Sequence, residues 1–178
     1  MFDKYSALFL SVALLTSGAA MANQEVGSGS MQFNGVLLLE ECVVDAGSAV
    51  QNIHIGDFNS SLFPQRDAVS PSKAFTIVLK NCTPAITGTK ITFSGDVDSN
   101  NTDLLALSNS STQTMATGIG IEILDSTGTP IKLNQETNQY ALREGDNTLN
   151  FQLRYKSTSS QVTAGDASAV MYFDLVYR

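Results

Sequence analysis

Few residues in this chain could carry covalent or metal chemistry. The only histidine, His54, stands between Ile53 and Ile55 in a segment with strand character, so we expect its imidazole on the solvent side. A Ser-His-Asp arrangement would have to use this histidine, and no G-x-S-x-G sequence surrounds any serine. One histidine and two distant cysteines do not form a zinc site. The sequence therefore predicts no enzyme and no cofactor.

An acidic run from Asp96 to Asp103 begins with the spacing of a calcium-binding loop. The sixth position of such a loop is normally glycine and here is Asn101. The twelfth position normally supplies a bidentate glutamate and here is Leu107. We therefore expect a solvated loop and no metal site.

The cysteines, Cys42 and Cys82, favour a structural role. Residues 1–22 have the form of a signal peptide, with an early charge at Lys4, an apolar run and small residues before a cut at Asn23. Because exported proteins meet oxidising conditions, we expect a Cys42–Cys82 disulfide, with two buried thiols as the alternative. The apolar run is far shorter than the roughly 20 residues of a spanning helix, and no later stretch predicts a membrane span.

Charge and composition narrow the possible partners. The net charge is −7 and the basic residues form no cluster, whereas binding to nucleic acid requires a concentrated positive face. Charged residues make up only 15% of a chain rich in Ser, Thr, Asn and Gly. This balance is typical of an exported β-rich protein, and residues 23–178 suffice for one domain.

Apolar residues recur at every second position along much of the chain, which predicts β-strands with one buried face. The pattern is clear in 75–80, 119–123 and 149–156, whereas 103–108 could be a strand or a short helical turn. Turn-forming residues separate these segments, as in 125–128, 144–147 and 164–166. Many short strands with one disulfide predict an all-β, immunoglobulin-like antiparallel sandwich.

Both ends of the mature chain also alternate. The odd-numbered positions Gly27, Gly29, Met31, Phe33 and Gly35 are separated by polar residues. Near the C-terminus, Met171, Phe173, Leu175 and Tyr177 share one face of a predicted strand. An alternating strand at a chain end is a candidate edge for pairing with another chain. The alternatives are an ordinary first strand with a frayed start and an ordinary closing strand.

Several motifs together resemble the type 1-like fimbrial subunits of Gram-negative bacteria, major or minor. The strongest are the penultimate Tyr177, Gly165 at the fourteenth position from the end, and the apolar alternation between them. Further matches are Phe33-Asn34-Gly35, Cys42-Val43-Val44-Asp45-Ala46-Gly47, Leu79-Lys80-Asn81-Cys82 and Ile119-Gly120-Ile121-Glu122-Ile123-Leu124-Asp125.

The resemblance implies a sandwich that lacks its last strand and has an open groove beside the C-terminal strand. A periplasmic chaperone would fill the groove first, contacting the surface formed by Gly165, Met171, Phe173, Leu175 and Tyr177. At the outer-membrane usher, the N-terminal strand of another pilus subunit would replace the chaperone. The resemblance divides the chain into a signal peptide (1–22), a donor-strand extension (23–36) with Gly27, Gly29, Met31, Phe33 and Gly35, and a sandwich domain (37–178).

In that family such a subunit reaches the cell surface within a fimbrium and contributes to adhesion. Without an additional lectin-like domain, it is expected inside the fibre rather than at the tip. The alternative function is a stand-alone secreted β-sandwich that binds carbohydrate. Such a module would need aromatic rings at loop tips, for which Phe58 and Phe63 are the candidates.

Overall fold

The computed structural model describes residues 32, 35, 41–108 and 114–178. Most of its regular structure is β-strand, which confirms the all-β prediction. The elements are β1 (Val43–Val44), α1 (Ala46–Ala49), the 3-10 turn η1 (Ser60–Leu62), β2 (Lys73–Cys82), β3 (Gly88–Ser94), β4 (Val97–Asp98), β5 (Asn101–Leu105), β6 (Ile119–Asp125), β7 (Pro130–Ile131), β8 (Tyr140–Ala141), β9 (Gly145–Ser157) and β10 (Tyr172–Tyr177). Within these described ranges, no helix has the length and apolar character needed to cross a membrane.

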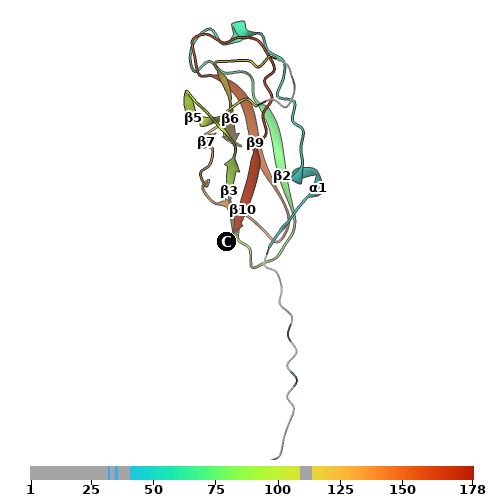
Figure 1. The fold of residues 1–178 in the computed structure, drawn as a ribbon. Coiled ribbons are helices and arrows are strands. Elements are labelled where there is room, and N and C mark those ends of the chain that lie inside the picture. Colours follow the sequence, from blue (N-terminus) through green and yellow to red (C-terminus); the bar gives the residue numbers. More distant parts are fainter. Residues whose placement is uncertain (1–31, 33–34, 36–40, 109–113) are drawn as a thin grey trace, which may run out of the picture. The chain divides into compact units, whose positions relative to one another are not determined.

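The strands form two antiparallel sheets, with β3 and β10 overlying the larger sheet in the view of Figure 1. The large sheet has the order β1-β2-β9-β6-β5-β4, with β7 beside β6. The small sheet has the order β10-β3-β8. Strand β10 pairs with β3 from Tyr172 opposite Ser94 to Tyr177 opposite Thr89. The last strand of the chain is therefore an edge strand of the small sheet.

The core lies between the two sheets and is built from the predicted alternating residues. Three phenylalanine rings join the sheets: Phe151 of β9 lies with its centroid 5.1 Å from Phe93 of β3 and 5.5 Å from Phe75 of β2. Around them, Ile77 and Ile91 are completely buried. Each such side chain contributes about 1.5–3 kcal/mol through burial, which holds the small sheet against the large one.

Strand β6 is more deeply buried than its sequence predicts. The alternation in 119–123 indicates one solvated face, but both faces are buried and the Glu122 side chain is only 4% exposed. Its carboxylate lies 2.6 Å from Arg154 Nη2 and 2.9 Å from Lys156 Nζ, both on β9. The prediction of a half-buried strand is wrong here because these two cations compensate the buried charge.

Of two further segments, one was left open by the sequence and the other differs from its prediction. The ambiguous stretch 103–108 contributes to strand β5, not to a helix. The segment around His54 is not a strand, although the imidazole is exposed as predicted, with Nε2 3.5 Å from Asp57 Oδ2. The acidic run forms the β4–β5 turn, in which Asp98 Oδ1 accepts hydrogen bonds from two backbone N–H groups. Among the described residues, no cluster of three or more His, Cys, Asp or Glu side chains could hold a metal ion.

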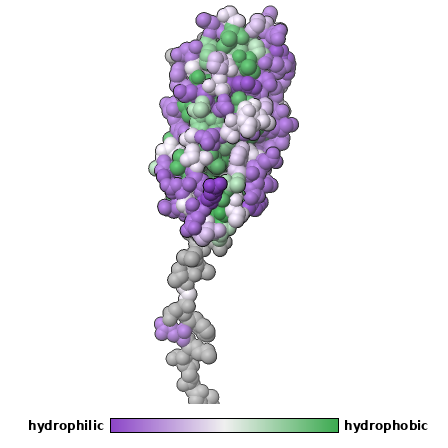
Figure 2. Space-filling view, turned by 180° about the vertical axis from the view of Figure 1, so that it is seen from behind, coloured by the Kyte–Doolittle hydropathy of each residue, from purple (hydrophilic) through white to green (hydrophobic). Residues whose placement is uncertain are grey.

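Apolar side chains also reach the surface of the domain. Figure 2 shows hydrophobic areas distributed along the length of one face between hydrophilic margins. Three exposed apolar side chains belong to β10 or immediately precede it: Val170, Tyr172 and Val176. Tyr172 is 68% exposed, so the outward face of β10 is not covered by the described part of the chain.

Candidate functional site

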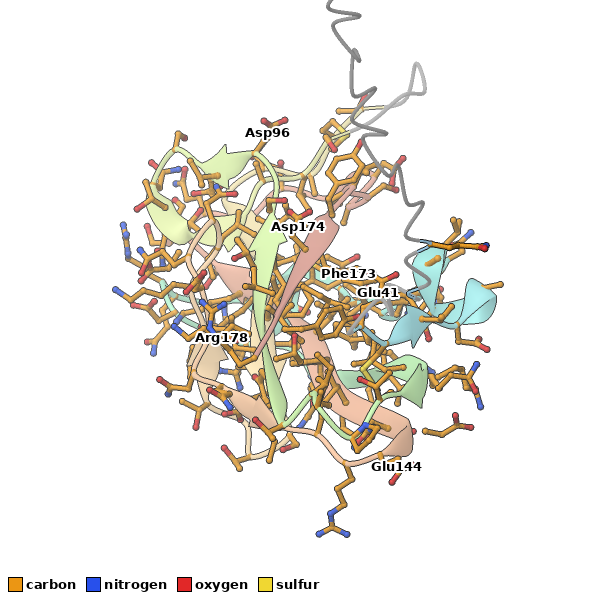
Figure 3. All side chains as sticks on the ribbon, turned by 90° about the horizontal axis from the view of Figure 1, so that it is seen from below. Glu41, Asp96, Glu144, Phe173, Asp174 and Arg178 are labelled. Carbon is orange, nitrogen blue, oxygen red and sulfur yellow. A yellow bond between two sulfur atoms is a disulfide. The ribbon has the colours of Figure 1, made fainter. Side chains whose placement is uncertain are left out.

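The inward face of β10 is incompletely covered. Phe173, Leu175 and Tyr177 pack against the core, yet each retains exposed surface. The equivalent residues of the adjacent strand, Ile91 and Phe93, are completely buried. Figure 3 shows Phe173 and Asp174 on opposite sides of β10, as strand alternation requires. In the described structure, the inward face of β10 is therefore less covered than the inward face of β3.

Within the described residues, no strand pairs with the outer backbone edge of β10. Arg178 N donates to Gly88 O at 2.8 Å, and Arg178 O accepts from Thr87 N at 2.8 Å. Since successive residues of a strand direct their N–H and C=O groups to opposite sides, the even-numbered residues of β10 bond to β3. The N–H and C=O groups of Phe173 and Leu175 point the other way, where the described chain supplies no backbone partner.

A groove of about 1240 Å³ lies beside the start of β10. Its floor is formed by core side chains of the large sheet, namely Phe75, Ile77, Ile119, Ile121, Leu153 and Tyr155. One wall is residues 162–174, which include the start of β10, and the other is the segment 51–58. A long apolar floor between two polypeptide walls can accept an extended chain.

The second wall, residues 51–58, was not identified as a site from the sequence. Ile53 and Ile55 turn partly into the core, while the exposed His54 lies between them on the groove wall. In the described structure, the backbone of residues 52–58 makes no hydrogen bond to other backbone groups. The Ile-His-Ile alternation was the available signal, but it predicted a strand within a sheet. It instead marks an extended segment without a strand partner.

One end of the groove is closed by aromatic side chains. The Tyr155 hydroxyl donates to Ala167 O at 2.9 Å, and the Phe58 ring stands edge-on to Tyr155 with 6.1 Å between centroids. Burial raises the pKa of Tyr155, with smaller contributions from Asp166 and Asp57. Phe63 is only 4% exposed. Phe63 is therefore buried and Phe58 is half-buried against Tyr155, so the two residues do not present a pair of exposed rings for carbohydrate.

Gly165 lies in the wall next to β10. A Cβ atom at this position would collide with the backbone of Thr114, Met115 and Ala116. The close approach is fixed by two hydrogen bonds of 2.9 Å, from Ala116 N to Asp166 O and from Asp166 N to Thr114 O. Glycine is thus required here for close packing of two backbone segments.

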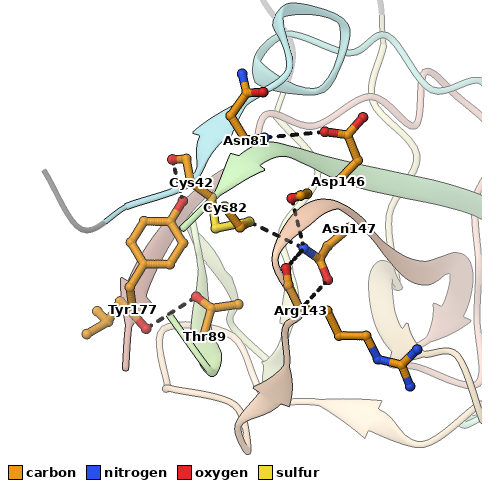
Figure 4. The surroundings of a disulfide bond; sticks show 10 residues. Cys42, Asn81, Cys82, Thr89, Arg143, Asp146, Asn147 and Tyr177 are labelled. Carbon is orange, nitrogen blue, oxygen red and sulfur yellow. Dashed lines mark hydrogen bonds between the residues drawn. A yellow bond between two sulfur atoms is a disulfide. The ribbon is translucent and has the colours of Figure 1, made fainter. Parts of the chain in front are cut away.

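The predicted Cys42–Cys82 disulfide is present and lies at the end of the site (Figure 4). It joins the beginning of the described domain to the end of β2. The Tyr177 hydroxyl donates to Cys42 O at 3.1 Å, and Asn147 Nδ2 lies 3.3 Å from Cys82 Sγ. Burial raises the pKa of Tyr177, with the nearby Glu41 adding to the effect. The penultimate tyrosine therefore links the last strand to the start of the domain.

Most of the predicted donor residues, Gly27, Gly29, Met31 and Phe33, lie outside the described residues, and Gly35 is exposed. Of the predicted edge residues, Gly165, Met171 and Phe173 line the groove, whereas Leu175 and Tyr177 lie further along β10, outside the groove lining.

Comparison with known proteins identifies the family. The family model described as fimbrial protein matches residues 31–178. The chain belongs to the fimbrial protein family. It is 43% identical to an uncharacterized fimbrial-like protein, YcbU, of Escherichia coli K12, with 96% of this chain and 94% of that protein covered. It is 38% identical to the type-1 fimbrial protein A chain of Salmonella typhi, with 93% of both chains covered.

The fold agrees with this assignment. A solved chaperone-usher pilus structure, described in relation to rod uncoiling, superimposes with a TM-score of 0.65 at 26% identity, covering 86% of this fimbrial chain and 97% of the solved one. The predicted resemblance to type 1-like fimbrial subunits is confirmed. Because the fimbrial relatives are structural subunits, the prediction that the chain is not an enzyme is confirmed as well.

Proposed function

We propose that this fimbrial protein is a structural subunit that polymerises by donating its N-terminal segment, residues 23–36, to the groove of another subunit. The sandwich domain would then be an immunoglobulin-like fold that lacks its last strand. The observation that carries this proposal is that no described strand pairs with the outer edge of β10, beside a groove of about 1240 Å³ with an apolar floor. An uncovered strand edge can pair with a strand of another chain.

An inserted strand would contact both walls of the groove. Its backbone would pair with the outward N–H and C=O groups of Phe173 and Leu175, and it would lie alongside the unpaired segment 52–58. The alternating Met31 and Phe33 side chains would enter the groove, while the glycines among the predicted donor residues allow close backbone approach. Burial of these two side chains alone supplies about 3–6 kcal/mol.

The proposed assembly route follows from the same groove. Residues 1–22 would direct export to the periplasm, where a chaperone would cover the apolar floor by contacting the edge formed by Gly165, Met171, Phe173, Leu175 and Tyr177. An outer-membrane usher would exchange the chaperone for the next subunit's extension. The resulting fimbrium would stand on the cell surface and mediate adhesion collectively.

The proposal is tested with the mature chain, residues 23–178, and a synthetic peptide of residues 25–37. We expect the chain alone to self-associate and the peptide to convert it into a monomer with a much higher melting temperature. The matched control is the same peptide with Met31→Ser and Phe33→Ser, which keeps the backbone but removes the apolar side chains. A well-folded monomer that ignores both peptides would show that no strand is missing.

Deletion of residues 23–34 tests the donor segment separately from the acceptor groove. The shortened chain should still bind the peptide, because its groove is intact, but it should not be added onto an earlier subunit. Incorporation of the shortened chain into fibres in the same proportion as the full mature chain would contradict donation by this segment.

A further inference from the structure

A subunit that polymerises through a sheet edge must keep its other edges closed, because any exposed strand edge can pair with another chain. In the described structure, strand pairing leaves open the side of β2 beyond the short β1, the side of β3 beyond the short β8, and the outer edges of the two-residue strands β1, β4, β7 and β8. Of these, β4 spans only two residues and is bent by a register shift, so it offers little to a partner. Strands β2 and β3 are long and need another form of protection.

The free side of β2 is covered by the segment Asp45–Gln51. Strand β1 pairs only with Leu79 and Lys80, so the rest of this edge lacks a neighbouring strand. Asp45 N donates to Val78 O at 2.9 Å, and Val78 N donates to the buried Ser48 Oγ at 2.9 Å. Further along, Gln51 Nε2 donates to Thr76 O at 2.9 Å. Two side chains thus replace the backbone of a strand.

The free side of β3 is covered in the same way by the segment 134–137. Ile91 N donates to Thr137 Oγ1 at 3.0 Å, and Ile91 O accepts from Thr137 N at 2.9 Å. The Asn134 amide bonds to both backbone groups of Gly95, donating from Nδ2 and accepting at Oδ1, each at 3.1 Å. A side-chain amide with this geometry occupies the positions that a paired strand would use.

Each covering segment contacts its strand over only a few residues, and segment 134–137 forms one isolated β-bridge to β3, between Glu136 and Thr92. The contrast with β10 is direct. Its edge has no comparable side-chain substitutes along Phe173 and Leu175 in the described structure. In the described structure, the edge of β10 is therefore uncovered, whereas the edges of β2 and β3 are covered.

We propose that Asp45–Gln51 and 134–137 are edge covers that confine strand addition to β10, so that subunits join in a single line without branching or lateral sheet growth. This inference rests on the proposed function. Ser48, Gln51, Asn134 and Thr137 act as blocking residues for a second copy of this chain.

The test removes the blocking side chains while the groove is filled. Two variants of the mature chain are made, Ser48→Ala/Gln51→Ala and Asn134→Gly/Thr137→Val. Glycine is used at Asn134 because this residue has φ 58°, where glycine is unstrained. The control is Ser160→Ala/Gln161→Ala, a matched pair of exposed residues in a loop. Each protein is saturated with the peptide of residues 25–37, and its association state is measured by light scattering.

We expect the peptide-saturated wild type and control to remain monomeric, and each edge variant to associate at a concentration at least tenfold lower. Hydrogen exchange provides a second readout in the same samples: the Val78 amide should exchange at least tenfold faster in the first variant, and the Ile91 amide in the second. This readout also shows whether each variant is folded, because the remaining core amides should keep their protection.

Edge variants that stay monomeric, or amides whose exchange does not change, would overturn the edge-cover proposal. Association of the loop control to the same extent would overturn it too, since the effect would then not belong to the edges. Failure of the proposed function has a different signature: the peptide would not raise the melting temperature of the wild-type chain at all.

Discussion

Removal of the disulfide should weaken both the domain and the groove. Cys42 and Cys82 are separated by 40 residues, a loop whose closure is worth about 4 kcal/mol in the chain-entropy model. The loop contains β1, which has only two residue pairs with β2, and the groove wall 51–58. Without the covalent link, residues 43–58 are held to the rest of the domain mainly by side-chain contacts.

The Cys42→Ala/Cys82→Ala variant should therefore melt about 8–16 °C lower, since 1 kcal/mol corresponds to about 2–4 °C for a domain of this size. It should also bind the peptide of residues 25–37 more weakly, because the wall is less ordered before binding. Thermal unfolding and peptide titration measure the two effects separately. Val43→Ser, a change at an exposed neighbour, serves as the control. Lower stability with unchanged peptide affinity would refute the role of the wall, and a loss below 1 kcal/mol would refute the entropy argument.

Three further changes are predicted to act at defined contacts. Tyr177→Phe removes the hydroxyl that donates to Cys42 O and should cost about 0.5–1.5 kcal/mol in urea unfolding. Because the folded-state pKa of Tyr177 is raised, the stability contributed by its hydroxyl is fully present below the ordinary tyrosine pKa and is lost as the pH rises through the folded-state pKa. The unfolding free energies of the wild type and Tyr177→Phe should therefore converge at alkaline pH. A constant difference up to strongly alkaline pH would contradict this. Glu122→Gln removes the buried carboxylate shared by Arg154 and Lys156, leaving Lys156 only the exposed Asp67, and should cost about 2–4 kcal/mol by the same assay. Glu136→Gln, in an exposed ion pair, should cost less than about 1 kcal/mol, and equal costs would show that burial of the pair is unimportant. Gly165→Ala should destabilise the domain by about 1–3 kcal/mol through collision with adjacent backbone, and a neutral effect would mean that the two segments can separate freely.

The alternation of apolar residues was sufficient to predict the sheets and most of the core. The segments 75–80 and 149–156 fall within β2 and β9 with the expected inward faces, and the disulfide was predicted from two cysteines that follow a predicted signal peptide. Where the alternation gave a wrong prediction, a polar interaction had buried a strand face that the sequence predicted to be exposed. At Glu122, an ion pair buried a face that the sequence marks as polar.

The groove could be predicted on one side only. Strand β10 has a regular pattern at the end of the chain, so its edge character could be inferred from local sequence. The opposite wall around Ile53 and Ile55 could not be predicted in this way, because its extended segment joins neither sheet of the described structure. Which segments join a sheet depends on the topology of the whole domain. The edge covers rest on single hydrogen bonds from Ser48 and Thr137, for which no sequence pattern is specific.

The central claim, that β10 accepts a strand along its outer edge, is tested most directly by amide hydrogen exchange of the mature chain with and without the peptide of residues 25–37. The amides of Phe173 and Leu175 point away from β3, toward the outer edge, whereas the register places those of Tyr172 and Asp174 toward β3. The peptide is predicted to protect the first pair strongly and to change the second pair much less. Peptide binding that leaves Phe173 and Leu175 unprotected would contradict strand addition at this edge.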